Sequence, residues 1–271
     1  MSGSATDNVR AEISREEARA WIERWDTQQS CNLPDREDRF TALIDAVEAV
    51  SGRPDPLVLD LGCGPGSLAV RLLNRMPNAT VIAIDADPVL LMLGRAAWAD
   101  LPGLVFTDLD LRTENIAQRL DLDRAPDAAV STTALHWLSG GDLENLYRQL
   151  AVLLRPGGLF LNGDHMADDP QVNPVLDRLG RALIEFEEGR RFPDGHAETW
   201  TGWWEAVRAE PALAEAMAAR ERRGLEAAHH GSAAGKLAVQ LAALRASGFI
   251  EAGTLWQRGV NRLLCGVRSP G

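Results

Sequence analysis

Val58-Leu59-Asp60-Leu61-Gly62-Cys63-Gly64-Pro65-Gly66 is an apolar strand that runs into three closely spaced glycines. Glycine lets the backbone approach a ligand because it has no Cβ. The helix expected to follow would present unpaired backbone N–H groups to a ligand in the turn. A dinucleotide-binding loop has its third glycine three residues after the second, and Ser67 stands at that place. The loop therefore predicts a nucleotide-like ligand and weakens the interpretation as an NAD site.

A second apolar strand, Val81-Ile82-Ala83-Ile84-Asp85, ends in a carboxylate. An acidic side chain at this place can accept hydrogen bonds from both hydroxyls of a ribose. The alternative is that Asp85 only caps the next turn. The glycine loop lies one strand–helix unit earlier, and the pair of motifs favours the ribose role for Asp85.

Outward from these motifs, short apolar strands alternate with helices. We expect strands at Leu57–Leu61, Thr80–Asp85, Leu104–Thr107, Ala128–Thr132 and Leu159–Asn162. We expect helices between them at Ser67–Arg75, Pro88–Ala99, Thr113–Leu120 and Asp142–Leu154. Strands separated by helices at this spacing predict an α/β fold with a parallel sheet and right-handed crossovers.

The ends of the chain differ from this alternation. Residues 1–56 are expected to form an N-terminal helical cap, with helices at Ser14–Asp26 and Arg36–Val50. Residues 57–166 and 232–271 are expected to form the Rossmann-like domain, which closes with a helix at Ala233–Ala246 and a hairpin of Phe249–Gln257 with Arg262–Arg268. Residues 167–231 are expected to be a helical insertion, a lid over the substrate cleft, with helices at Asn173–Arg191 and Glu198–Arg222.

The glycine loop, Ala83-Ile84-Asp85 and the turn Leu153-Leu154-Arg155-Pro156-Gly157-Gly158 together resemble the class I S-adenosylmethionine-dependent methyltransferases. The resemblance spans about Leu57–Leu161. It implies a Rossmann-like methyltransferase fold, with a mostly parallel seven-stranded sheet and an antiparallel C-terminal hairpin. It also implies S-adenosyl-L-methionine as the cofactor.

The resemblance assigns cofactor contacts by position. Asp60, Gly62 and Gly64, with Gly66 completing the loop, would lie along the methionine part, and Asp85 with Ala86 would hold the ribose. Asp108 falls where the family has an acidic contact to the adenine amino group, with Leu109 beside the ring. Asp110 is close enough to be the true contact. Thr132, beside Ser131 and Thr133, would lie at the methyl-donor end of the cleft.

Two histidines follow strands, where ligands bind in open α/β sheets. His136 comes after the fourth strand, and His165, next to Asp164, ends the fifth. A histidine there can remove a proton from a hydroxyl or amine acceptor. We expect His165, with Asp164, as the first candidate base and His136 as the second, although either can instead be a packing histidine.

His229 and His230 have no ligand-spacing motif with other residues, and His196 is expected in a surface loop, so no metal is expected.

Tryptophans and N-terminal polar residues are weaker signals. Trp137, Trp200, Trp203 and Trp204 can line an apolar or aromatic substrate pocket, but the helical spacing of the last three favours core packing of the insertion. Helices ahead of the first strand often fold over the cleft in methyltransferases of this kind. Gln28, Gln29 and Arg36 are therefore candidates for a lid or for contacts to the cofactor carboxylate, the alternative being a solvated helix end.

The composition limits the partners. The formal net charge of −11 makes nucleic acid a poor partner. Three widely spaced cysteines suggest neither a disulfide framework nor a zinc site. A polar N-terminus and the lack of a long apolar run predict a cytoplasmic protein without a membrane partner.

We therefore expect an enzyme that methylates a small molecule, with an oligomeric state that the sequence leaves open. In-line positioning would dominate the chemistry, because the sulfonium already makes the methyl group electrophilic. The first alternative is an enzyme of the same fold that catalyses a non-methylating reaction such as cyclisation. The second is a non-catalytic cofactor-binding module.

Overall fold

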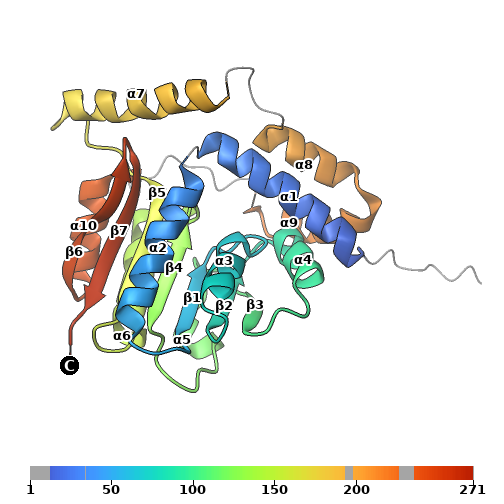
Figure 1. Ribbon diagram of the computed structural model, residues 1–271, viewed down its shortest axis with the longest axis horizontal. Coiled ribbons are helices and arrows are strands. Elements are labelled where there is room, and N and C mark those ends of the chain that lie inside the picture. Colours follow the sequence, from blue (N-terminus) through green and yellow to red (C-terminus); the bar gives the residue numbers. More distant parts are fainter. Residues whose placement is uncertain (1–12, 34, 193–197, 226–234, 271) are drawn as a thin grey trace, which may run out of the picture.

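Seven strands form a single sheet in the order β3-β2-β1-β4-β5-β7-β6 (Figure 1). The computed structural model describes residues 13–33, 35–192, 198–225 and 235–270. The strands are β1 (Leu57–Leu61), β2 (Thr80–Asp85), β3 (Leu104–Asp108), β4 (Ala128–Thr132), β5 (Leu159–His165), β6 (Phe249–Arg258) and β7 (Asn261–Arg268). Strands β1 to β5 pair in parallel, and β7 pairs antiparallel with both β5 and β6. The predicted Rossmann-like sheet with a C-terminal hairpin is confirmed.

The interior strand β1 is buried along its whole length, as expected for a strand covered on both faces. Alternate residues serve opposite faces. Val58 belongs to the core under α2 and α3, whereas Leu59 and Leu61 belong to the core under α6 and α10. The parallel register aligns Leu61 with Ile84, so the glycine loop and Asp85 lie together at one edge of the sheet.

Helices cover both faces of the sheet (Figure 1). They are α1 (Arg15–Asn32), α2 (Arg36–Ser51), α3 (Ser67–Arg75), α4 (Pro88–Ala97), α5 (Ile116–Arg119), α6 (Gly140–Leu153), α7 (Pro174–Arg191), α8 (Trp200–Ala209), α9 (Ala214–Arg222) and α10 (Leu237–Ala246). Two 3-10 turns, η1 (Leu135–Trp137) and η2 (Pro211–Leu213), complete the described elements. No helix among the described residues is long and apolar enough to cross a membrane.

A third core joins segments that are distant in the sequence. Trp25 of α1, Trp203 and Trp204 of α8, and Leu90 of α4 are buried together. Trp25 and Trp203 meet edge to face, with ring centroids 5.0 Å apart. This packing holds α1 and the α8–α9 pair beside the glycine loop.

Several helices differ from the sequence expectation, and three of these differences have a plain description. The predicted helix Glu198–Arg222 is broken between α8 and α9, because Pro211 begins a 3-10 turn. The predicted helix Thr113–Leu120 is only the single turn α5, which Asn115 caps. Helix α1 continues to Asn32, six residues beyond its expected end.

Candidate active site

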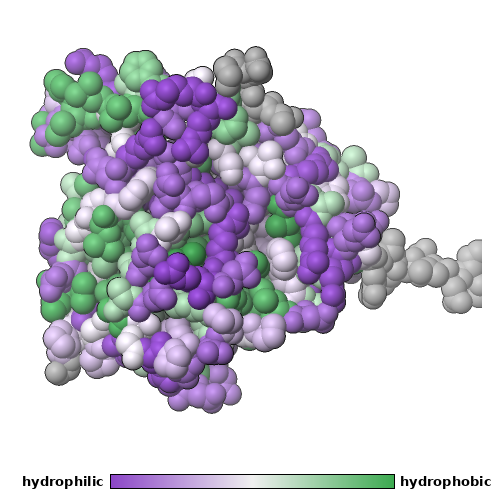
Figure 2. Space-filling model, in the orientation of Figure 1, coloured by the Kyte–Doolittle hydropathy of each residue, from purple (hydrophilic) through white to green (hydrophobic). Residues whose placement is uncertain are grey.

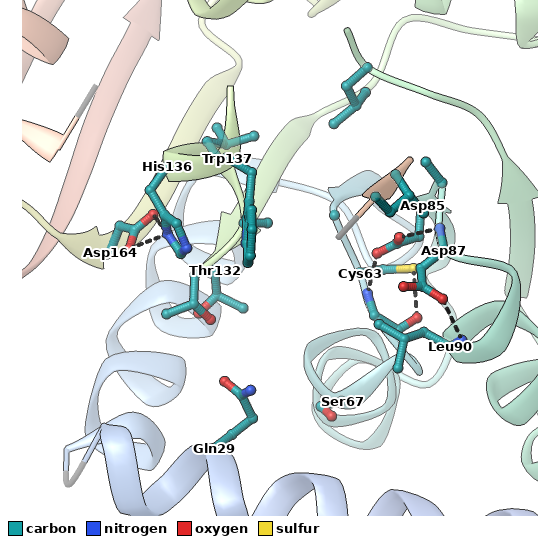
Figure 3. Close-up of a pocket in the computed structure, with 18 of the residues that line it drawn as sticks. Gln29, Cys63, Ser67, Asp85, Asp87, Leu90, Thr132, His136, Trp137 and Asp164 are labelled. Carbon is teal, nitrogen blue, oxygen red and sulfur yellow. Dashed lines mark hydrogen bonds and ion pairs between the residues drawn. The ribbon is translucent and has the colours of Figure 1, made fainter. Parts of the chain in front are cut away.

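A cavity of about 660 Å³ lies at the carboxyl ends of the parallel strands. Its volume is within the range of small-molecule sites. The turns after β1, β2, β3 and β4 and the end of β5 line it, together with side chains from α1, α8 and α9. Figure 3 shows His136 and Asp164 on one side of the cavity and Cys63, Asp85 and Asp87 on the other. The cavity therefore brings the glycine loop and the two candidate histidines to one place.

The glycine loop is tied to the neighbouring strand by backbone hydrogen bonds. The N–H groups of Gly62 and Cys63 donate to the Ile84 carbonyl at 2.8 and 3.0 Å. Gly62 and Gly64 have positive φ and line the cavity. Gly66 also has positive φ but does not line the cavity; it is the N-cap residue of α3, and a Cβ there would lie 2.8 Å from the Phe106 ring.

The side chain of Asp85, the last residue of β2, binds this loop. Its Oδ2 accepts from the Gly64 N–H at 2.7 Å, and its Oδ1 accepts from the Asp87 N–H at 2.8 Å. Burial, together with the charge of Asp87, raises the pKa of Asp85 to about 6. Ala86 lines the cavity beside it. Asp85 is thus an acceptor that is already oriented at the tip of the second strand.

Asp60 is fully buried in the middle of β1 and is not among the residues that line the cavity. Neither carboxyl oxygen has a hydrogen-bonding side-chain partner among the described residues. Burial, with the nearby charge of Asp85, raises the pKa of Asp60 to about 8. A backbone hydrogen bond from Ala69 offsets this rise only in part, so the ionised form of the buried carboxyl is costly.

The two acidic candidates after β3 lie in different places. Leu109 and Asp110 line the cavity, and Asp110 is also paired with Arg112 at 2.7 Å. Asp108 does not line it; its carboxylate accepts two hydrogen bonds from Arg223, at 2.7 and 2.8 Å. The geometry favours Asp110, the alternative contact, over Asp108.

A histidine–aspartate pair lies at the other side of the cavity. His136 Nδ1 is 2.9 Å and 3.0 Å from the two carboxyl oxygens of Asp164. Because an ionised carboxylate only accepts, Nδ1 carries a proton, and in a neutral ring Nε2 carries the lone pair. Burial lowers the pKa of His136, but the charge and hydrogen bond of Asp164 outweigh it, so the pKa is raised overall. This pair has the geometry of an oriented general base.

His165 lines the same cavity but has a different environment. Its backbone N–H donates to Asp164 Oδ1 at 2.8 Å, whereas its side-chain Nε2 is buried with no hydrogen bond to any described residue. Burial lowers the pKa of His165, which keeps the ring neutral. Asp164 therefore binds the ring of His136, whereas the sequence positions suggested a pairing with His165.

Arg39 of α2 lies beneath the pair and was not predicted as a site residue. It is completely buried, and it donates to Asn261 Oδ1 at 2.7 Å and to Thr132 Oγ1 at 2.6 Å. Burial lowers its pKa to about 10, so it stays charged at neutral pH. Its charge helps to lower the pKa of Asp164. The available signal was the position of Arg39 four residues before Leu43, which places a charged residue on the apolar face of the helix.

The N-terminal helix and the tryptophans complete the lining. Gln29, Arg36 and Trp25 line the cavity, whereas Gln28 is buried and does not line it. Trp137, Trp200 and Trp204 line it as well, and Trp203 is in the core. Trp137 and Trp200 thus line the cavity, Trp203 packs in the core, and Trp204 does both.

Thr132 and three further histidines are the remaining residues that the sequence analysis considered. Thr132 lines the cavity and accepts from Arg39. His196, His229 and His230 lie outside the described residues. Within the described residues, no group of three or more His, Cys, Asp or Glu is arranged to hold a metal ion.

The sequence is similar to known proteins over part of its length. Residues 58–158 match the family described as a methyltransferase domain. The trans-aconitate 2-methyltransferase of Methylobacterium radiotolerans is 38% identical over 104 residues, which is 38% of this chain and 36% of that protein. The trans-aconitate 2-methyltransferase of Deinococcus radiodurans is 34% identical over 135 residues, 48% of each chain. The chain thus matches half or less of the length of these curated relatives.

The fold is also found in solved structures. The magnesium protoporphyrin IX methyltransferase of Synechocystis PCC 6803 with bound SAH superposes with a TM-score of 0.51 and 19% identity, over 89% of this chain and 87% of that one. The S-adenosylmethionine-dependent methyltransferase SibL superposes with a TM-score of 0.51 and 17% identity, over 85% of this chain and 54% of that one. At this identity the likeness concerns the fold alone.

Proposed function

This chain carries a class I S-adenosylmethionine-dependent methyltransferase domain, and we propose that it transfers a methyl group to a small molecule bound in the cavity beside His136. The single observation that carries the proposal is the hydrogen bond from His136 Nδ1 to Asp164 in the wall of that cavity. The acceptor class and the individual contacts below belong to the proposal.

The residues around the glycine loop fit S-adenosylmethionine. Asp85 would accept from the ribose hydroxyls, and Leu109 with Asp110 would face the adenine. Gly62 and Gly64 would lie along the methionine part, whose ammonium charge would lower the raised pKa of the buried Asp60 carboxyl. Arg36 lines the cavity and has an Nη1 without a hydrogen bond to any described residue, which suits the cofactor's carboxylate. When bound, the cofactor supplies a methyl group that its sulfonium makes electrophilic.

His136 would serve an acceptor that has a proton to lose. Asp164 fixes the ring through Nδ1–H, which puts the lone pair of the neutral ring on Nε2, the atom that would take the proton of a hydroxyl. Asp164 also stabilises the imidazolium that forms. The tryptophans would exclude water and hold an apolar body, and the buried Nε1 of Trp204, which has no hydrogen bond to a described residue, offers it a donor.

A second candidate is methylation of a carboxylate, favoured by the relatives named trans-aconitate 2-methyltransferase. A carboxylate has no proton to lose at neutral pH, so no base is needed. His136, whose pKa Asp164 raises against the effect of burial, would then act in its protonated form and donate to the acceptor. The two candidates thus use the same histidine in opposite protonation states.

The test is transfer of a labelled methyl group from S-adenosylmethionine to a hydroxyl panel and a carboxylate panel that includes trans-aconitate, over about pH 5.5 to 8.5. With a hydroxyl acceptor, kcat should rise with pH through the pKa of His136, and His136→Asn should lower kcat by about 10²- to 10⁴-fold and remove the rise. With a carboxylate acceptor, KM should rise with pH, and His136→Asn should raise KM and make it independent of pH.

His165→Asn is the matched control, because His165 lines the same cavity without the bond from its ring to Asp164. It should keep the wild-type pH profile. Activity of His136→Asn with an unchanged profile would contradict the role of His136. Product formed without S-adenosylhomocysteine would contradict methyl transfer and favour a non-methylating reaction of the same fold.

A further inference from the structure

Helix α7 exposes a continuous apolar face to solvent. Five large apolar side chains of the helix and Val172 just before it are each at least half exposed: Val172 72%, Val175 52%, Leu176 57%, Leu179 52%, Leu183 50% and Phe186 64%. Single exposed apolar residues are ordinary, but a contiguous patch of this kind marks an interaction surface. In Figure 2 the hydrophobic colour gathers over the left end of α7. Leu176, Leu179, Leu183 and Phe186, the seam residues, recur at spacings of three and four, as along a helix–helix seam.

A neighbouring face of α7 attaches the helix to the domain. The backbone of Gly180 packs on the Gly259–Val260 turn, where a Cβ on Gly180 would lie 3.0 Å from a Val260 methyl. Glu187 pairs with Arg258, and Arg191 pairs with Asp35 at 3.2 Å. These contacts hold the apolar face outward. Helix α7, which is described in full, contributes no side chain to the cavity, so the face is not part of the active site.

The apolar face is symmetric about Arg181. Leu176 and Phe186 are five residues on either side of it, and Leu179 and Leu183 are two residues on either side. Two copies of α7 that run antiparallel would therefore pair Leu176 with Phe186 and Leu179 with Leu183, each pair twice. Such self-complementarity is what a two-fold interface requires.

Charge supports the same orientation. Arg178 and Glu185 flank one edge of the face, and neither has an ion-pair partner among the described residues. Antiparallel packing keeps this edge on the same side of both copies, so that Arg178 of each copy approaches Glu185 of the other. The helix itself has four acidic and four basic residues, a balance that does not favour an anionic membrane.

We propose that the exposed face of α7 is a homodimer interface in which α7 packs antiparallel on α7 of a second copy. Ala182, one residue from the centre of symmetry, is small enough for the two backbones to approach closely. A contact built mainly from one helix pair is at the small end of specific interfaces, so the dimer should dissociate on dilution.

Sedimentation of the full chain from about 1 to about 100 µM tests the proposal, since dimers of modest affinity associate in this range. The wild type should change from monomer to dimer, and Leu179→Glu and Leu183→Glu should each raise the dissociation constant at least about 10-fold. Val152→Glu is the matched control, because Val152 is 76% exposed on α6 and outside this face. A wild type that stays monomeric throughout, or a dimer that Leu179→Glu leaves intact, would overturn the proposal.

Charge exchange and crosslinking test the orientation. Arg178→Glu alone and Glu185→Arg alone should weaken the dimer, and an equal mixture of the two variants should form a heterodimer. Ala182→Cys should crosslink to itself, whereas Val175→Cys should crosslink only when mixed with Gly189→Cys. The three native cysteines are buried and give little background. Crosslinking of Val175→Cys to itself would refute the antiparallel arrangement.

Discussion

Asp108 and Asp110 are two residues apart, yet only Asp110 reaches the cavity. The difference follows from the end of β3. Asp108 is the last residue of the strand, aligned with Asp85, and its side chain is 40% exposed and bound to Arg223. Asp110 follows the turn in which the Leu109 N–H donates to the Asp85 carbonyl at 3.0 Å. Sequence spacing alone could not separate these two carboxylates, because strand ends are uncertain by a residue or two.

We predict that Asp110→Asn weakens S-adenosylmethionine binding more than Asp108→Asn. Loss of a hydrogen bond to a charged acceptor costs about 1.5–3 kcal/mol, or about 10- to 150-fold in affinity. Asp108→Asn removes only a partly exposed ion pair, which contributes about 0–1 kcal/mol. Isothermal titration calorimetry with both variants and the wild type measures the difference. The reverse order of affinities would restore Asp108 as the adenine contact.

At the scale of elements, the glycine loop and the β4–η1 connection depend on each other. Gly62 has a φ of 70°, and a Cβ there would lie 2.3 Å from the Ala134 Cβ. Ala134 directly precedes the turn that carries His136. The loop after β1 and the histidine turn after β4 thus touch through a contact that only glycine permits.

We predict that Gly62→Ala lowers both stability and catalysis. The positive φ costs about 1–2 kcal/mol, and the overpacked contact adds about 1–3 kcal/mol. Gly157→Ala is the matched control, because Gly157 has a φ of 71° but the nearest atom to its Cβ is 3.8 Å away. In urea denaturation the cost of the positive φ should lower the free energy of unfolding of both variants. Only Gly62→Ala should show a further loss, from the contact with Ala134. Equal losses would show that the Ala134 contact relaxes without cost.

At the scale of the whole molecule, the sequence predicted the sheet well and the electrostatics poorly. The bounds of β1, α3, β2 and β4 agree with the prediction, because apolar strands and the glycine turn before α3 carry local signals. Arg39 was missed because its partners Thr132 and Asn261 are 93 and 222 residues away. The predicted preference for His165 came from its position at the end of the fifth strand. The bond from Asp164 to His136 depends instead on how β4 and β5 align, which no local pattern records. In the same way, no local pattern told which tryptophans line the cavity.

The buried charges also act on the stability of the whole fold, and Asp60 offers the clearest test. Its pKa is raised from 3.8 to about 8, chiefly by burial. Between these values the folded protein holds a proton that the unfolded chain has lost. Stability should therefore fall as pH rises across this window, by up to about 1.4 kcal/mol per pH unit for one proton. Asp85, whose pKa is about 6, adds to the slope mainly below that pH.

We predict that Asp60→Asn flattens the fall in unfolding free energy between about pH 6.5 and 8, since the amide has no proton to lose there. The pKa of His136 is also raised in the folded protein, so deprotonation of His136 likewise lowers stability as pH rises. A smaller slope should therefore remain in Asp60→Asn. Asp127→Asn is the control: Asp127 accepts from the Leu57 N–H and from Arg124 and Arg155, and its pKa is lowered because these partners outweigh its burial. That variant should be destabilised with an unchanged slope, because Asp127 is ionised throughout the window. Urea denaturation at each pH and moderate salt measures all three proteins. Equal slopes for Asp60→Asn and the wild type would mean that Asp60 ionises at an ordinary pKa and that the fold already stabilises its charge.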